Sequence, residues 1–343
     1  MLAVRTAIFA CLVLTACDGN PFNGQPSTGT GSGATSVSTL PGTDNPSSTT
    51  NISRTEARDK GPGGGEVVGN GYAEGFRYDA SKDTFTVDNL AFDGGNTYTR
   101  STTIPSAGPG DLAGVYEASS TYADSQTGAQ IDQLSYRALY GVSMTGRTNF
   151  AIVRTGSYVP YGFGGFVFNR KGGVVMPTAG QAQYKGSYAG LRDFDGTGGL
   201  QITSADMRVA IDFNDFNPDE GLAGKAAYGL IDNRKIFDLD GNDITASVLT
   251  GINADKNPDF ALTELPTILF KVGPGDVDLN GELEGELSDF ITANGKDTTF
   301  EDGKYYAVLS GKNADELAGV IVITSDINGI TARETGGFIL YRP

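Results

Sequence analysis

Short runs in which apolar and polar residues alternate follow one another from about residue 71 to the C-terminus, and Gly, Asn and Asp separate them. The alternation is plain in residues 207–213, where Met207, Val209, Ile211 and Phe213 are apolar. A period of two places successive side chains on opposite faces of a strand. These runs predict short β-strands joined by tight turns, so we expect an all-β fold.

The predicted strands fall into two blocks around the glycine-rich segment 161–165. The first block, residues 71–165, is expected to form a small β-rich domain. The second block, residues 166–343, holds eight candidate strands, namely 181–191, 200–213, 222–231, 235–248, 277–290, 304–310, 317–324 and 330–341. Eight closely spaced strands predict a closed antiparallel barrel, because closure leaves no sheet edge exposed. Side chains fill the interior of a barrel of this size, or it holds one small ligand.

A barrel that spans a membrane is the competing interpretation of the second block. Its strands would present an apolar surface to lipid, with aromatic residues at both ends. Charged residues instead stand at positions expected to face outward, namely Lys185, Arg192, Asp206, Arg208 and Glu284. The pattern therefore favours a barrel that lies outside the bilayer.

The first residues have the layout of an export signal. Arg5 precedes an apolar stretch, residues 6–16, that is shorter than the ~20 residues a membrane-spanning helix needs. The Leu-Thr-Ala-Cys motif that ends at Cys17 matches the bacterial lipobox. We predict a signal peptide over residues 1–16 and lipidation of Cys17, for example with palmitate. The alternative is a buried N-terminal strand, which the polar residues that follow could not continue.

Residues 17–70 consist largely of Gly, Ser, Thr, Pro and Asn, and Phe22 is their one aromatic residue. Such a composition buries too little apolar surface to offset the entropy lost on ordering the chain. We therefore expect residues 17–70 to form a lipidated, disordered tether between the membrane and the two folded domains.

Composition excludes several classes of function. The chain contains no His and no Trp, which rules out His-containing catalytic triads, His-bound zinc and His-ligated haem. Its two cysteines are Cys11, which the signal peptide would remove, and Cys17, so no disulfide is expected. The net charge of −16 repels nucleic acid, and we expect no nucleic-acid partner.

Three segments of the second block resemble the barrel domains of transferrin-binding protein B and related surface lipoproteins. Residues 176–190 (Met-Pro-Thr-Ala-Gly-Gln-Ala-Gln-Tyr-Lys-Gly-Ser-Tyr-Ala-Gly) resemble the first barrel strand of that family. Residues 207–213 and 222–227 are similar to its strand ending in Asp-Phe and the glycine-centred return strand. Residues 305–320 resemble its Phe-Tyr-Gly-Pro-Asn-Ala segment, although Lys312 stands in place of the Pro.

This resemblance implies a handle domain followed by an eight-stranded barrel, present once here and twice in the transferrin-binding members. It implies a surface-exposed lipoprotein of the outer membrane that binds an iron- or haem-carrying partner for an outer-membrane transporter. The alternative is a structural or adhesive envelope lipoprotein without a soluble ligand. Asp18 leaves the choice between inner and outer membrane open.

The clearest candidate for chemistry is an acidic turn. Asp276, Asp278 and Asn280, followed by Gly281, reproduce the first half of a calcium loop, in which oxygen ligands alternate. Leu287 occupies the place of the final bidentate Glu, so a β-turn before a strand is the alternative. No Ser or Lys stands in a nucleophile motif, so no catalytic residue is assigned and an enzyme is not expected.

Aromatic residues cluster at the junction of the two blocks. We expect them to form core at the domain junction, and the alternative is a contact surface for a partner. The cluster comprises Tyr158, Tyr161, Phe163, Phe166 and Phe168.

Overall fold

A computed structural model describes residues 37–57, 73, 75–90, 92–157, 163–214, 225–271 and 276–343. The predicted signal peptide and Cys17 lie outside these residues. Within the described ranges, no helix has both the length and the apolar character needed to cross a bilayer.

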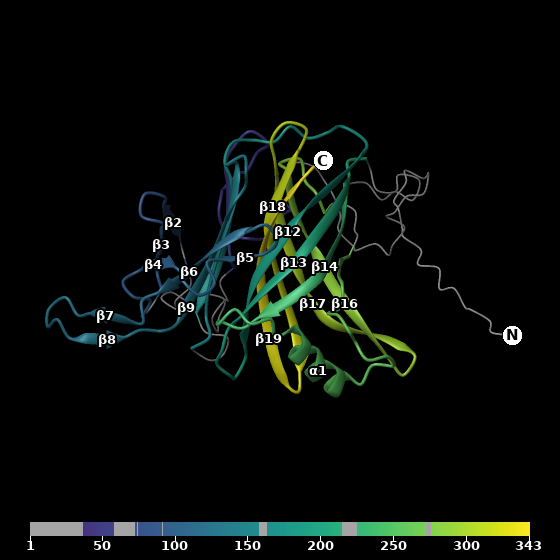
Figure 1. Cartoon of the computed structure of the whole chain (residues 1–343). Coiled ribbons are helices and arrows are strands. Elements are labelled where there is room, and N and C mark those ends of the chain that lie inside the picture. Colours follow the sequence, from purple (N-terminus) through teal and green to yellow (C-terminus); the bar gives the residue numbers. More distant parts are fainter. Residues whose placement is uncertain are drawn as a thin grey trace, which may run out of the picture.

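The first domain, here called the handle, is a curled antiparallel sheet of nine strands (Figure 1). The strand order is β1-β11-β10-β9-β6-β4-β3-β2, and β5 pairs with β6. A separate two-stranded hairpin, β7–β8, projects from the handle. The strands are β1 (Ile52–Thr55), β2 (Phe76–Asp79), β3 (Thr84–Val87), β4 (Thr97–Arg100), β5 (Ser106–Ala107), β6 (Ala113–Ala118), β7 (Thr121–Ala123), β8 (Gln130–Asp132), β9 (Tyr136–Val142), β10 (Thr148–Thr155) and β11 (Gly164–Arg170).

The second domain is a closed antiparallel barrel of eight strands, as predicted. The first and last strands, β12 and β19, close it with pairs that run from Lys185↔Tyr341 to Phe194↔Ala332. The strands are β12 (Gln181–Phe194), β13 (Gln201–Asp212), β14 (Ala226–Phe237), β15 (Ile268–Phe270), β16 (Glu282–Ala293), β17 (Lys296–Ser310), β18 (Glu316–Ile327) and β19 (Ile330–Tyr341). The prediction of an all-β handle and barrel is confirmed.

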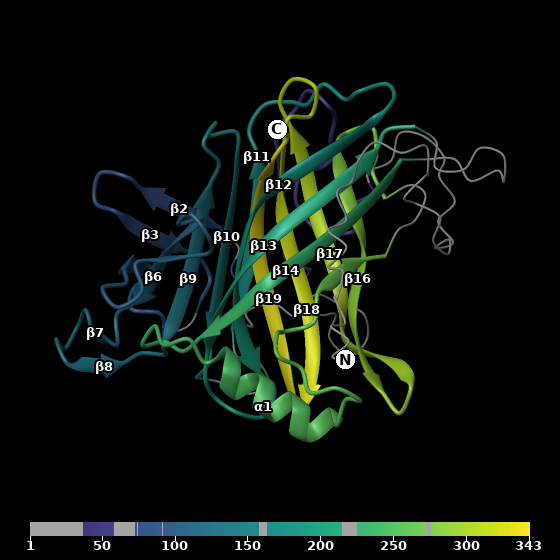
Figure 2. The same cartoon turned by 45° about the vertical axis from the view of Figure 1, so that its right-hand side comes forward.

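One predicted barrel strand is wrong. Residues 235–248 contain the end of β14 and the start of a helix, α1 (Thr245–Lys256). The barrel reaches eight strands through β15, which was not predicted. The buried residues of α1, Leu249 and Ile252, pack in a small core at one end of the barrel. Figure 2 shows α1 lying across that end. Tertiary packing thus imposes the helix on a sequence with little helical propensity.

The handle and barrel share a hydrophobic core. Phe150 on β10 and Phe166 on β11 pack with Leu191 on β12 and Ile339 on β19, and all four are at most 2% exposed. Burial on this scale stabilises each large apolar side chain by roughly 1.5–3 kcal/mol. The two domains therefore form one packed unit.

Phe166 and Phe168 belong to this shared core, as expected for the aromatic cluster at the junction. Phe163 packs against the handle core, while Tyr158 and Tyr161 lie outside the described residues. The junction itself differs from the expected boundary at residue 165. β11 belongs to the handle sheet and ends at Arg170, and the barrel begins at Gln181.

The expected tether is wrong for residues 37–57. These residues run along the handle and barrel, and β1 pairs antiparallel with β11. Ile52 is buried in the shared core, and the Arg54 guanidinium contacts Glu282 of β16 through Nε–Oε1 at 2.6 Å and Nη2–Oε2 at 2.9 Å. A linker-like composition concealed this segment, because Arg54 is buried through its ion pair and not through hydrophobicity.

Candidate functional site

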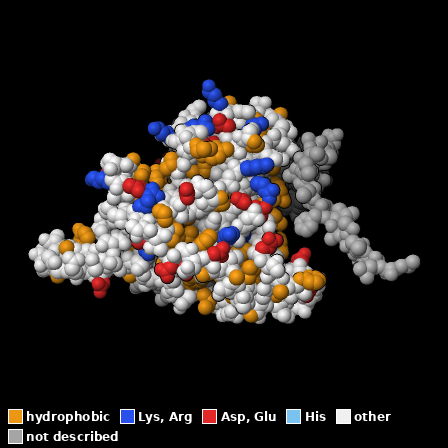
Figure 3. Space-filling model, viewed as in Figure 1, with side chains coloured by type: hydrophobic (Ala, Val, Ile, Leu, Met, Phe, Trp, Pro, Cys, Tyr) orange, Lys and Arg blue, Asp and Glu red, His pale blue; other side chains and the backbone are white. Residues whose placement is uncertain are grey.

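The β7–β8 hairpin and the loop beside it form an exposed apolar surface at the far end of the handle. Its large apolar side chains are Phe92 (61% exposed), Tyr122 (47%) and Ile131 (39%). These three residues are here called the handle tip. Figure 1 shows the hairpin extending away from the barrel, and Figure 3 shows apolar side chains on this projecting end.

Local contacts hold the loop of Phe92 against the base of the hairpin. The Leu134 backbone N–H donates to the Phe92 carbonyl at 2.8 Å, and the Gly94 N–H donates to Gln133 Oε1 at 3.1 Å. The Tyr122 ring lies close over Gly95, where an added Cβ would come within 2.4 Å of the ring. The tip is therefore an ordered surface, and Gly95 is required beneath the tyrosine.

A buried carboxylate anchors the same loop to the handle core. Asp93 is 2% exposed, and it accepts hydrogen bonds from the Asn96 N–H at 3.1 Å and from the Tyr98 hydroxyl at 3.2 Å. Burial raises the pKa of Asp93 above its usual value, because the charged form loses its hydration. Its part is to hold the loop and not to perform chemistry at the surface.

The handle tip has the properties of a contact surface for another protein. Aromatic and large aliphatic side chains supply most of the binding energy at many interfaces. Every residue of β7 and β8 is exposed, so the outer edges of both strands are open to solvent. The tip residues were not identified from the sequence. Tyr122 and Ile131 lie in short polar runs, and only the projection of the hairpin distinguishes them.

The barrel interior holds a buried cluster of charged residues near α1, here called the interior charge cluster. It comprises Arg192, Arg234, Asp289, Glu301 and Glu334, each at most 9% exposed. Arg234 forms an ion pair with Glu301, and its Nη1 lies 3.4 Å from Asp289 Oδ2. Glu334 accepts hydrogen bonds from the hydroxyls of Tyr188 at 2.6 Å and Thr203 at 2.9 Å.

Asp289 and Glu301 are neighbouring carboxyl groups within this cluster. The Glu301 backbone N–H donates to Asp289 Oδ1 at 2.7 Å. Burial, together with the nearby negative charge of Glu301, raises the pKa of Asp289 to about 9. Asp289 therefore holds its proton at neutral pH. The positive charges of Arg192 and Arg234 then balance the negative charges of Glu301 and Glu334 inside the barrel.

The predicted calcium residues lie together in the turn before β16. Asp278 Oδ1 accepts hydrogen bonds from the backbone N–H groups of Asn280 and Glu282, both at 2.8 Å. Asp278 Oδ2 accepts one from Val37 at 3.2 Å. In the described part of the chain, no three His, Cys, Asp or Glu side chains are grouped to hold a metal ion. Calcium binding at Asp276, Asp278 and Asn280 stays a prediction.

The strand assignment also corrects one residue of the barrel. Arg192, expected on the outside, shares the inward face of β12 with Tyr184 and Tyr188 and is 3% exposed. Its Nε lies 3.6 Å from Glu334 Oε2. The interior charge cluster compensates the charge of Arg192, so this charged residue of the alternating pattern faces the barrel interior and not the solvent.

Comparisons with known proteins find solved structures of low sequence identity. No family model and no curated protein matches the chain. Similar solved structures include a double mutant and a single mutant of transferrin binding protein B from Haemophilus parasuis Hp5, with identities of 12% and 13%. Both have a TM-score of 0.36, and the matches cover 78% of this chain but 44% and 45% of those chains.

A third similar structure is intact Ap-TbpB with its N and C lobes, at 12% identity and a TM-score of 0.33. This match covers 77% of the present chain and 45% of the other. The chain thus spans less than half the length of each of these structures. The handle-like sheet beside a closed barrel, the fold that the sequence resemblance implied, is established by the strand pairing of this chain itself.

Proposed function

We propose that this chain is a lipid-anchored binding protein of the bacterial cell envelope that contacts a protein partner through the handle tip. The observation that carries the proposal is the exposure of Phe92, Tyr122 and Ile131 on one projecting end of the handle. Large apolar side chains gathered on an exposed end favour a partner that covers them. The open edges of β7 and β8 could pair with an extended segment of that partner.

The sequence resemblance favours an iron- or haem-carrying protein as the partner, which this chain would capture for an outer-membrane transporter. A haem group would then be held by the partner or by Tyr and other aromatic contacts, because the chain has no His. The rival role is a structural or adhesive one, in which the tip contacts cells or matrix and captures no soluble protein.

The binding proposal is tested with the full-length protein and two purified probes, serum transferrin and haemoglobin, by surface plasmon resonance. We expect saturable binding of one probe, and we expect Tyr122→Ser to weaken it by about 30-fold, the effect of an interface anchor worth ~2 kcal/mol. Met144→Ser is the matched control, because Met144 is 84% exposed in the β9–β10 turn, away from the tip. Equal effects of both variants would exclude the tip as the contact surface.

Anchoring is tested separately from binding. Metabolic labelling with palmitate should tag the wild-type protein and not the Cys17→Ala variant. Protease treatment of intact cells should cut a surface-exposed protein, whereas a protein cut only after lysis faces the periplasm. Absence of label on the wild-type protein would refute the lipid anchor and leave the binding experiment unaffected.

A further inference from the structure

A cavity of about 340 Å³ opens at the end of the barrel that α1 covers. Its walls come from β12, β13, β18, β19 and α1 and are mostly apolar, with Phe194, Val248, Ile327 and Ile330 among them. A volume of this size is within the range of small-molecule pockets. The chain enters the described structure at the other end of the barrel, where Val37 contacts Asp278.

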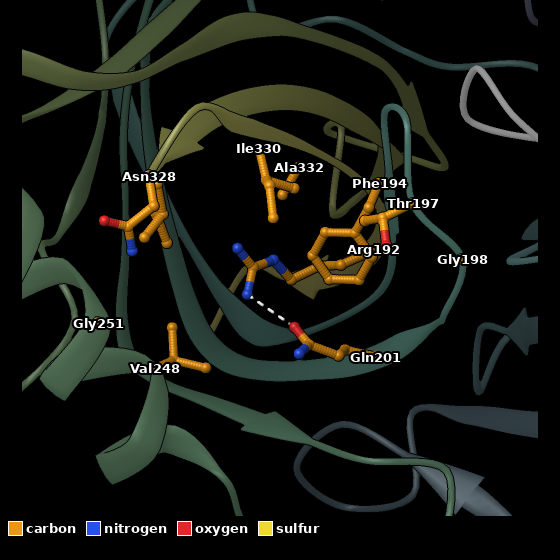
Figure 4. Close-up of a pocket in the computed structure, with 11 residues that line it drawn as sticks. Arg192, Phe194, Thr197, Gly198, Gln201, Val248, Gly251, Asn328, Ile330 and Ala332 are labelled. Carbon is orange, nitrogen blue, oxygen red and sulfur yellow. Dashed lines mark hydrogen bonds between the residues drawn. The ribbon is translucent and has the colours of Figure 1, made fainter.

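A single charged side chain reaches into this cavity. Figure 4 shows the Arg192 guanidinium in its centre, with the Phe194 ring beside it. Among the residues that the structure describes, the guanidinium makes one hydrogen bond, from Nη1 to Gln201 Oε1 at 3.0 Å. Its Nε is buried with no hydrogen-bond partner, since Glu334 Oε2 at 3.6 Å is too distant to accept. A guanidinium has five N–H donors, so those of Arg192 outnumber its acceptors in the described part of the chain.

The interior charge cluster explains why Arg192 has N–H donors without an acceptor. Glu334 Oε2 lies between two guanidinium groups, 3.6 Å from Arg192 and 3.8 Å from Arg234. Its other oxygen is occupied by Tyr188 and Thr203. Glu334 therefore compensates the charge of Arg192 without satisfying its hydrogen bonds. A buried donor without an acceptor costs free energy that a bound acceptor would recover.

We propose that this cavity binds a small amphiphilic carboxylate, such as a medium-chain fatty acid, with its carboxylate on Arg192 and its chain against the apolar wall. Two carboxylate oxygens match the parallel N–H donors of a guanidinium, and the pair is strongest where water is excluded. The aliphatic residues that line the cavity suit an alkyl chain. This site is independent of the handle tip and of the protein partner proposed for it.

The chain offers a sharp steric test at Gly251, which lines the cavity from α1. A Cβ added there would meet one atom, Ile327 Cγ2, at the ordinary contact distance of 3.8 Å. Gly251→Leu should therefore fold normally and fill the cavity, and a helical Gly is in any case unfavourable. Ser247→Leu is the matched control, because Ser247 is an exposed residue of the same helix outside the cavity lining.

Calorimetric titration would use dodecanoate and dodecan-1-ol, below their aggregation limits, on the full-length chain carrying Cys17→Ala, so that no acyl chain of the protein competes. We expect dodecanoate to bind saturably, the alcohol to bind at least about tenfold more weakly, and Arg192→Gln to weaken dodecanoate by about 10- to 100-fold. Gly251→Leu should abolish binding, and Ser247→Leu should not change it.

Three results would overturn the proposal: no binding of dodecanoate, equal binding of dodecanoate and the alcohol, or unchanged binding by Gly251→Leu. If Arg192→Gln fails to fold, the alcohol and the Gly251→Leu variant still decide the question. Because neither probe contacts the handle tip, the outcome is separate from that of the protein-binding experiment.

Discussion

Replacement of Arg54 by Met tests whether residues 37–57 belong to the folded unit. Arg54 and Glu282 are separated by 228 positions in the sequence, and their side chains are 5% and 1% exposed. Arg54 Nη1 also donates to the carbonyls of Leu40 at 3.3 Å and Thr43 at 3.2 Å. Arg54→Met would remove an ion-pair partner of the buried Glu282 carboxylate, a change that costs up to about 3–5 kcal/mol.

The loss can be measured by urea denaturation of the full-length protein, followed by circular dichroism. With a slope of about 3 kcal/mol per molar urea for a large domain, the midpoint should fall by roughly 1 to 1.7 M. Adding Glu282→Met should recover much of the loss, because an apolar pair can replace a buried ion pair. Arg208→Met is the control. Its partner is Asp232, and because the Arg208 side chain is 52% exposed, the pair is expected to contribute at most about 1 kcal/mol. An Arg54→Met midpoint equal to that of the wild type would refute the placement of this segment.

Three further predictions concern the barrel. The Asp289→Asn variant should gain stability relative to wild type as pH rises from about 4 toward about 9, by up to ~1.4 kcal/mol per pH unit. The reason is that native Asp289 keeps a proton that the unfolded chain releases. If the difference between the urea midpoints of the two proteins is the same at pH 5 and pH 8, the raised pKa is contradicted. Gly337→Ala places a Cβ 2.2 Å from the buried Phe150 ring across the handle–barrel interface and should lower the free energy of unfolding by at least about 1–3 kcal/mol. Gly251→Ala is the control and should not destabilise the protein. Equal melting temperatures of the two variants would contradict the packing at Gly337. The predicted calcium site requires that added Ca²⁺ raise the melting temperature and that Asp278→Asn remove the rise. An unchanged melting temperature would favour the β-turn alternative, in which backbone N–H groups occupy the Asp278 oxygens.

The strands were predictable wherever one face of the barrel is buried. The expected strand 330–341 coincides with β19, and the expected start at residue 181 coincides with β12. Alternation is a direct consequence of burying one face of a strand, so the sequence records it. β15 has three residues and no room to show a period, and it is a strand because β14 and β16 pair with it.

The interior charge cluster was less accessible to sequence reasoning. Arg192 was expected outside because a lone charge in an alternating run usually marks the solvent face. Yet Arg192 follows Tyr184 and Tyr188 at intervals of four, and these positions share one face of a strand. This register was a usable signal. The residues that compensate the buried charge of Arg192 could not be predicted in this way. Glu334 and Arg234 come from strands that are distant in the sequence, and residue spacing does not show that they meet.

The N-terminal segment shows why composition alone misplaces a domain boundary. A fragment that begins at residue 71 would follow the composition, but it would lack β1 and the buried side chains of Leu40, Ile52 and Arg54. It would leave β11 with an open edge and Glu282 without its ion-pair partner Arg54. Arg170 would also lose the carbonyl acceptors of residues 47 and 50, at 2.8 and 3.0 Å. A fragment intended for partner capture must therefore start before residue 37, since a failure of residues 71–343 to bind would report the missing strand and not the handle tip.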